Sequence, residues 1–159
     1  MKKIKLYLVI LLIPAVLIPL VLFSCSNSNR GEKIKFDTIV KGFYSEKEEK
    51  EYFVIKDKDS LNQLLAKIMD SSPDANARNI NFNEEMVIAV FMGKKATGGF
   101  SIEIVDVLKQ KDYIEILIKT DEPDPGQMVT EAITSPYHII KLKRYDMEFL
   151  FNIVEQQWD

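Results

Sequence analysis

The chain has 159 residues, of which 47% are hydrophobic and 28% charged, and its formal net charge at pH 7 is −3. This length is enough for one compact domain, and we find no internal repeat or low-complexity linker that would indicate a second. The acidic balance argues against a nucleic-acid-binding protein, which needs a concentrated basic face. A single cysteine excludes intramolecular disulfide bonds, so the fold must be held by packing alone.

The N-terminal residues have the pattern of an export signal. Three lysines, at positions 2, 3 and 5, precede an uncharged apolar run over residues 6–23, which is typical of a signal peptide. The run is also close to the ~18 residues that can span a bilayer, so an uncleaved N-terminal anchor is the alternative.

Four residues at the end of this run distinguish the two interpretations. "LFSC" (22–25) resembles the lipobox of bacterial lipoproteins, although Phe23 departs from the smaller residue most common there. In that family a diacylglycerol is attached to the cysteine thiol, and cleavage makes the cysteine the new N-terminus. The resemblance implies a lipoprotein signal peptide over residues 1–24 and a lipid on Cys25. It also implies a domain in the cell envelope, anchored to a bacterial membrane on its extracytoplasmic side.

The mature chain is expected to be a tethered acidic domain. Removal of residues 1–24 takes away three of the 21 basic side chains and none of the 24 acidic ones, which brings the formal charge from −3 to −6. Polar residues over 25–33 form a short tether, and residues 34–159 form a single domain.

Two strands open this domain. Residues 34–45 and 51–57 are rich in β-branched and aromatic side chains, which favour strands. The charged run "YSEKEEKEY" (44–52) between them is predicted to be a solvated hairpin connection.

One helix follows, and then a buried strand. Ser60 and Gln63 form a capping-box pattern at the helix start, and residues 71–73, which include a proline, end it. The helix has one apolar stripe, formed by Leu61, Leu64, Leu65 and Ile68. Residues 86–91 are apolar without alternation, so we expect a central strand that is covered on both faces.

Four further strands complete the domain. Residues 100–108 and 113–120 form a hairpin, and the alternation in its first strand changes phase, which indicates either a bulge near Ile104 or coverage on both faces. Residues 136–143 and 147–155 form a last hairpin. Together these elements predict a β-rich α+β fold of about seven mostly antiparallel strands, with one helix packed on the sheet.

A glycine-rich segment follows the predicted central strand. "MGKKATGGFSI" (92–102) lacks the Lys and the Ser or Thr that follow the second glycine of a phosphate-binding loop, and a strand comes next instead of a helix. We therefore predict that Gly98 and Gly99 form a tight turn, since glycine adopts positive φ at little steric cost.

Two longer stretches carry a family resemblance. "INFNEEMVIAVFMGKKATGGFSIEIVDV" (80–107) and "DEPDPGQMVTEAITSPYHIIKL" (121–142) resemble a family of exported bacterial proteins named for PrcB, a subunit of a surface protease complex. Members often have Trp in the helix, where this chain has Leu61 and Leu64. The positions that match the family pattern are Asn81, Phe82, Gly93, Lys95, Thr97, Gly98, Gly99, Phe100, Pro123, Pro125, Thr134 and Pro136.

The resemblance implies an accessory lipoprotein and not a protease. The member that gives the family its name associates with a subtilisin-like protease and supports assembly of its complex. Many relatives have no assigned activity. The resemblance therefore implies a protein partner, with a subtilisin-like protease as the first candidate.

No catalytic set is found in the sequence, and we expect no enzyme activity. The one histidine, His138, shares a predicted strand face with Ile140 and Leu142, which favours a partly buried strand residue over a general base. Cys25 is expected to be acylated, and "G-x-S-x-G" is absent. A zinc site would lack its usual ligands, and no cofactor is expected.

An acidic loop is the remaining candidate for a metal. Asp121, Glu122 and Asp124 lie close together in the sequence, and such loops can hold calcium, but the twelve-residue calcium-loop pattern is absent. The alternative is that these acids keep a proline-stiffened loop solvated, and we assign no metal ligand.

Two stiff loops are the candidate binding segments. The 94–100 corner offers two cations, a hydroxyl and an aromatic ring, and the 121–137 stretch offers acids followed by Met128 and Ile133. Restricted loops lose less conformational entropy when they bind a protein. The alternative for each residue is a place in the core or in a turn. The candidate binding residues are Lys94, Lys95, Thr97, Gly98, Gly99, Phe100, Pro123, Pro125, Thr134, Pro136 and Tyr137.

Three functions are compatible with the sequence. The favoured one is a membrane-anchored lipoprotein that binds another protein without catalysis, as an assembly or stabilising subunit of a surface protease complex. The second is a protease inhibitor that presents the "TGGF" and "SPY" segments as loops. The third is an enzyme or a small-ligand-binding or calcium-binding lipoprotein that uses His138 or the acidic loop.

Replacement of Cys25 by alanine tests the lipobox. Cys25→Ala has no thiol to acylate, so we expect the full-length chain to lose fatty-acid labelling and membrane retention in metabolic labelling and fractionation. Ser24→Ala keeps a small residue before the cysteine and serves as the control. Persistent labelling of Cys25→Ala would refute the assignment.

Overall fold

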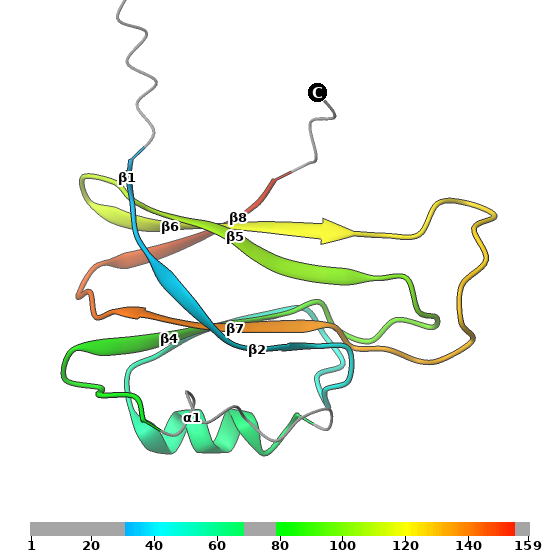
Figure 1. Ribbon diagram of the computed structural model, residues 1–159, viewed down its shortest axis with the longest axis horizontal. Coiled ribbons are helices and arrows are strands. Elements are labelled where there is room, and N and C mark those ends of the chain that lie inside the picture. Colours follow the sequence, from blue (N-terminus) through cyan, green and yellow to red (C-terminus); the bar gives the residue numbers. More distant parts are fainter. Residues whose placement is uncertain (1–30, 69–78, 155–159) are drawn as a thin grey trace, which may run out of the picture.

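Residues 31–68 and 79–154 are described by a computed structural model of the chain. They form two four-stranded β-sheets stacked on one another, with one helix against the outer face of the second sheet (Figure 1). The first sheet has the order β1 (Glu32–Lys33), β5 (Ser101–Lys109), β6 (Tyr113–Asp121) and β8 (Glu148–Val154). The second sheet has the order β2 (Phe36–Gly42), β7 (Tyr137–Lys143), β4 (Glu85–Phe91) and β3 (Glu51–Ile55). Neighbouring strands are antiparallel except β6 and β8, which run parallel.

β4 is covered on both faces, as its uninterrupted apolar sequence predicts. Side chains at even positions, from Met86 to Val90, pack into the core between the two sheets. Those at odd positions, from Val87 to Phe91, pack against helix α1 (Lys58–Leu65). All of them have 0% solvent exposure. β4 therefore contributes to both apolar cores. Each of its large apolar side chains, when fully buried, contributes about 1.5–3 kcal/mol to stability.

The N-cap of α1 differs from the prediction. Asp57 is the N-cap, and its carboxylate accepts hydrogen bonds from Ser60 N and from Ser60 Oγ, both at 2.8 Å, which lower the pKa of Asp57. The predicted capping box starting at Ser60 is therefore wrong, because an acidic side chain three residues upstream takes the amide of Ser60. Leu61 and Leu64 are buried against the second sheet, as predicted. The predicted helix end at 71–73 is wrong, because α1 already ends at Leu65 with Ala66 as its C-cap. Beyond it, the carbonyl of Lys67 accepts from the amide of Glu46 (2.8 Å), and Ile68 forms a β-bridge with Ser45 instead of continuing the helix.

The seven predicted strands are present, but two predicted hairpins are wrong. β2 and β3 are separated in the second sheet by β7 and β4, so their connection crosses the end of the sheet. β7 and β8 lie in different sheets, because both edges of β7 are already paired, with β2 and with β4. β8 pairs with β6 instead. The β5–β6 hairpin is confirmed.

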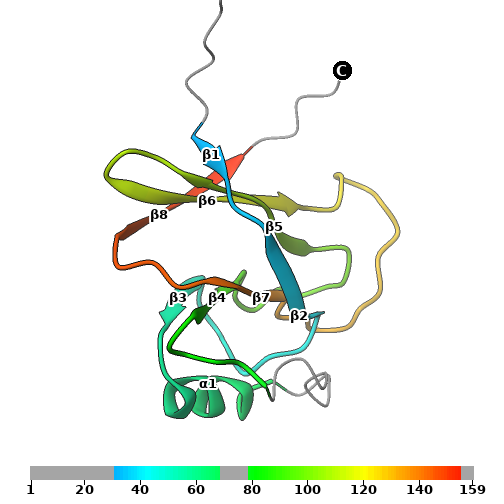
Figure 2. The ribbon, with the colours of Figure 1, turned by 60° about the vertical axis from the view of Figure 1, so that its left-hand side comes forward.

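The eighth strand, β1, comes from residues that were expected in the polar tether. The amide of Ile34 donates to the carbonyl of Val107 (2.8 Å), and Lys33 Nζ lies 2.6 Å from Asp106 Oδ1. Glu32 and Lys33 thus pair with β5 through the backbone, and Lys33 also has a charged partner there, which shortens the tether. The chain continues into β2, so residues 32–42 connect the two sheets along one side (Figure 2).

A β-bulge in β5 holds the histidine of β7. The pairing of β5 with β6 shifts between Ile104 and Asp106, which agrees with the bulge, one of the two alternatives that the sequence left open. His138 is 2% exposed, more deeply buried than the sequence suggested. Its Nδ1 accepts from the amide of Ile104 (2.9 Å), and its Nε2 lies 3.0 Å from Thr38 Oγ1. Since Nδ1 accepts, Nε2 carries the proton and donates to Thr38, so one neutral ring joins β7, β5 and β2.

The buried position of His138 between the two sheets strongly lowers the pKa of its ring. Burial first, and the charge of Lys41 second, lower the pKa of His138 from 6.5 to about 4, while Glu103 acts in the opposite direction. Lys41 and Glu103 also pair with each other (Nζ to Oε2, 2.7 Å), which adds a second polar link between β2 and β5. A protonated ring could not accept from Ile104, so the joint requires neutral histidine.

Acidification should weaken the fold through His138. The unfolded chain binds this proton below pH 6.5 and the folded chain only below about 4, so the free energy of unfolding should fall by about 3 kcal/mol between pH 7.5 and 4. His138→Gln cannot titrate and is the comparison. It should be less stable than the parent at pH 7.5, and the difference should narrow toward pH 4 in urea unfolding. If the free energy of unfolding changed with pH in the same way in both proteins, the contribution of neutral His138 would be contradicted.

Candidate functional site

Four strand ends meet at one end of the second sheet. Gly42 at the end of β2 pairs with Tyr137 at the start of β7, and Tyr137 pairs with Phe91 at the end of β4. Phe91 in turn pairs with Glu51 at the start of β3. The β2–β3, β4–β5 and β6–β7 connections therefore all reach this end of the sheet.

The two candidate binding loops lie side by side there. Lys95 and Thr134 exchange backbone hydrogen bonds of 2.7 and 3.0 Å, and the amide of Gly98 donates to the carbonyl of Thr130 (2.9 Å). The buried Thr134 hydroxyl donates to the carbonyl of Thr97 (2.8 Å). Thr97, Gly98 and Thr134 thus hold the β4–β5 and β6–β7 connections together.

The paired glycines form the predicted turn. Gly99 has φ +88°, and a Cβ there would lie 3.0 Å from a methyl carbon of Val129 and 3.2 Å from Pro123 Cβ. A Cβ on Gly98 would lie 2.3 Å from Thr130 Oγ1. The turn needs glycine for its backbone at one position and for close approach of the neighbouring loop at the other.

The aromatic candidates are partly or wholly core residues. Tyr137 is fully buried and stacks on Phe91, with ring centroids 5.9 Å apart. Phe100 is half-buried against the core between the sheets, and Lys95 Nζ lies 5.0 Å from its ring centroid. Pro125 is exposed. The candidates that are buried are Gly98, Thr134, Pro136 and Tyr137.

The β2–β3 connection, which the sequence placed in a solvated turn, is the third part of the site. The amide of Ser135 donates to the carbonyl of Phe43 (2.7 Å). The hydroxyls of Ser45 and Ser135 lie 2.8 Å apart, and Ser135 Oγ donates to the carbonyl of Lys47 (2.6 Å). Both serines are buried. The two small hydroxyl residues gave no signal in the sequence, because they lie 90 residues apart.

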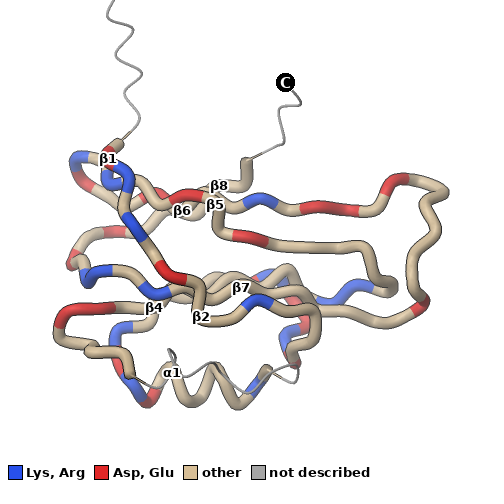
Figure 3. The backbone as a smooth tube through the Cα atoms, in the orientation of Figure 1, with Lys and Arg blue, Asp and Glu red and all other residues tan. Residues whose placement is uncertain are grey.

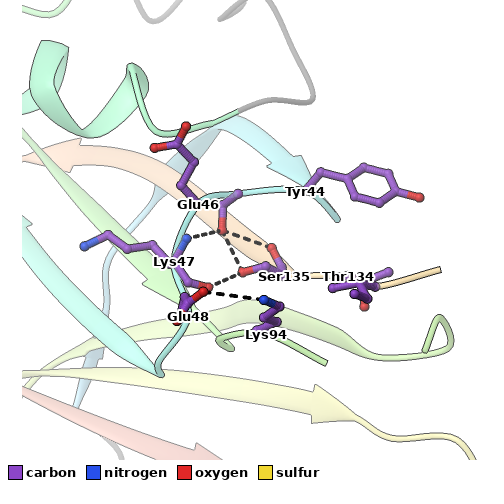
Figure 4. A pocket seen from close by; sticks show the side chains of 9 residues that line it. Tyr44, Glu46, Lys47, Glu48, Lys94, Thr134 and Ser135 are labelled. Atoms are coloured by element: carbon purple, nitrogen blue, oxygen red, sulfur yellow. Dashed lines mark hydrogen bonds and ion pairs between the residues drawn. The ribbon is translucent and has the colours of Figure 1, made fainter. Parts of the chain in front are cut away.

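These three connections enclose a pocket of about 460 Å³ (Figure 4). Lys94 and Glu48 form an exposed ion pair on it (3.4 Å), and the ring of Tyr44 projects away from the serine cluster. Of the candidate residues, Lys94 and Thr134 contribute to the lining. The pocket is lined by Tyr44, Ser45, Glu46, Lys47, Glu48, Lys94, Ile133, Thr134 and Ser135.

The hydroxyl groups in the pocket are engaged in structural hydrogen bonds. Ser45 Oγ donates to the carbonyl of Ser135 (3.2 Å), and Ser135 Oγ donates to that of Lys47. His138, the chain's one histidine, is tied to Thr38 and Ile104 between the sheets. Neither serine therefore has the histidine held against it as the base that a nucleophile requires.

One side chain of the acidic loop, Asp121, is also held by contacts within the fold. Asp121 accepts a hydrogen bond from Ser101 Oγ (2.8 Å) and pairs with Lys119 (3.2 Å), and both contacts lower the pKa of Asp121. In the part of the chain that the structure describes, no three His, Cys, Asp or Glu side chains converge on a point where a metal ion could bind.

Two exposed apolar side chains, Tyr44 and Ile133, line the pocket, and the exposed Phe43 directly precedes Tyr44 in the chain. Ile133 is 60% exposed, Phe43 50% and Tyr44 41%. We call these three residues the apolar rim. The sequence indicated Ile133, but it missed Phe43 and Tyr44, because they were assigned to a strand end and to a charged turn.

The chain forms a β-rich domain with a core between two sheets, and hydrogen bonds hold its loops together at one end of that core. Residues 86–143 match the family model described as PrcB C-terminal, which confirms the predicted resemblance over this segment. The matched segment runs from β4 to β7 and contains both candidate loops. No curated protein and no solved structure matches the chain. Among the described helices, none is long and apolar enough to cross a membrane.

Substitution of Gly99 tests the geometry of the paired loops. Gly99 and Gly126 both have φ +88°, but a Cβ on Gly126 would meet nothing within 4 Å. Gly99→Val and Gly126→Val share a backbone cost of about 1–3 kcal/mol. Only Gly99→Val adds contact with Val129 and Pro123, so it should be the less stable variant in urea unfolding. Equal loss in both variants would contradict the close approach of the loops.

Proposed function

We propose that the protein is an exported, lipid-anchored subunit without catalytic activity that binds another protein, as an assembly or stabilising subunit of a surface protease complex. The match to the PrcB C-terminal model supports the link to a protease complex. The lipobox pattern at residues 22–25 supports the anchor.

The apolar rim is the observation that carries the binding role. Tyr44 and Ile133 are exposed in the pocket lining and Phe43 is exposed next to Tyr44, although the same connections bury other side chains. Exposed apolar and aromatic groups beside a pocket are typical of protein interfaces. Backbone hydrogen bonds between the connections hold the rim in place, so binding would order few groups.

Charge offers a less specific alternative for recognition. Acidic and basic residues are interspersed over both sheets (Figure 3), and several form pairs with each other, such as Lys94 with Glu48 (3.4 Å). Exposed pairs of this kind contribute little energy. The apolar rim is therefore the more distinctive feature of the described surface.

An inhibitor that presents the "SPY" segment receives less support. Ser135, Pro136 and Tyr137 are all buried, and Ser135 is hydrogen-bonded to the β2–β3 connection. A loop that enters a protease active site must be accessible. An assembly role uses the exposed rim instead.

Charge introduced into the rim tests the proposal. The full-length tagged chain should recover a partner from detergent-solubilised membranes, and Ile133→Glu should reduce recovery about tenfold, since loss of an apolar anchor costs about 1–2 kcal/mol or more. Val105→Glu adds the same charge at an exposed valine of β5 and should leave recovery unchanged. Equal recovery with Ile133→Glu, or no partner at all, would count against the proposal.

A further inference from the structure

A second depression lies between β3 and α1. It has a volume of about 290 Å³ and is separate from the pocket except for one shared residue, Lys47. We call it the β3–α1 groove. It is lined by Lys47, Phe53, Val54, Ile55, Ser60, Gln63, Leu64 and Lys67.

One wall of the groove is an open strand edge. β3 is the last strand of the second sheet, and among the described residues its backbone is hydrogen-bonded only to β4. Alternate amide and carbonyl groups of such a strand point outward without a partner. Phe53 and Ile55 face α1, whereas Val54, 36% exposed, points to the opposite face and reaches the groove at the strand edge.

The other wall is one stripe of α1 and the turn that follows it. Ser60, Gln63, Leu64 and Lys67 are spaced i, i+3, i+4 and i+7, so they lie on one side of the helix. A strand edge that faces a helix across a narrow groove is the geometry in which extended peptides bind by adding a strand. Figure 2 shows β3 at the outside of the sheet, above α1.

The groove has an uneven charge. Its lining contains two lysines and no carboxylate. Both lysines lie at one end, because the amide of Glu46, next to Lys47, donates to the carbonyl of Lys67 (2.8 Å). Glu51 pairs with Lys47, but Lys67 is exposed and has no ion-pair partner among the described residues.

We propose that the β3–α1 groove binds an extended segment of the partner protein, which adds to the edge of β3 and places an acidic side chain beside Lys67. This inference rests on the proposed function and names the kind of partner segment. The backbone of the segment pairs with β3, and its alternate apolar side chains contact Phe53 and Leu64. Because Lys47 lines both depressions, the segment continues from the groove toward the pocket and the apolar rim.

Site-specific photo-crosslinking in cells tests the inference. A photoreactive residue is placed at position 54 of the full-length chain, or at position 105 as the control, since Val54 and Val105 are 36% and 38% exposed. We expect position 54 to crosslink to a segment of another protein that contains Asp or Glu, identified by mass spectrometry of the crosslinked peptide. Position 105 should give no such product. A crosslink from position 54 to a second copy of this chain, or none above the level at position 105, would overturn the inference.

Charge reversal supplies the second test. The identified segment is synthesised with blocked termini, and its affinity for the full-length chain is measured by fluorescence anisotropy. Lys67→Glu should weaken binding about tenfold, whereas Lys111→Glu, the same change at an exposed site in the β5–β6 turn, should have no effect. Equal affinity of the two variants would overturn the charge assignment.

The two proposals fail in different ways. If capture recovers a partner and a photoreactive residue at position 133 crosslinks to it, but position 54 does not, the groove is wrong and the proposed function stands. If capture recovers no partner, the proposed function itself fails.

Discussion

Burial of β4 and β7 on both faces is the constraint on which the rest of the structure depends. Strands that are apolar on both faces need one layer above and one below, and the first sheet and α1 supply these layers. Both strands also need neighbours on both edges, so β2 and β3 occupy the outside of the second sheet. Their connection must then cross the ends of β7 and β4. The pocket exists because residues 44–48 follow that path.

The local features of the fold could be predicted because their signals are local. An apolar run without alternation identified β4, and a change of phase near Ile104 indicated either a bulge or coverage on both faces, of which the structure has the bulge. The glycine pair identified a turn, as the φ of Gly99 confirms. The strand neighbours could not be predicted in this way. Short connections suggested hairpins, but the edges of β7 are taken by strands distant in sequence, and loop length carries no information about them.

The same limit applies to the polar contacts of the interior. A bulge leaves a backbone amide without its usual ladder partner, and a buried unpaired amide costs about 1–3 kcal/mol. His138 accepts from the amide of Ile104 and donates to Thr38, so all three groups are satisfied. The histidine and the change of phase are each visible in the sequence. That they meet depends on how the two sheets stack, as does the contact of Ser45 with Ser135.

These satisfied contacts also define what remains for binding. Thr97, Thr134 and the two serines direct their hydrogen bonds into the fold, so the polar groups of the pocket are largely committed. The described surface also presents the exposed apolar side chains of the rim and the backbone groups on the edge of β3, and both recognise polypeptide better than a small polar molecule. Lys47 connects the two regions. Its ammonium lies 4.4 Å from the ring centroid of Phe53 and pairs with Glu51, so the pocket and the groove keep a fixed relation to each other. A partner chain could therefore contact both without rearrangement of the domain, which favours tight association over a loose encounter.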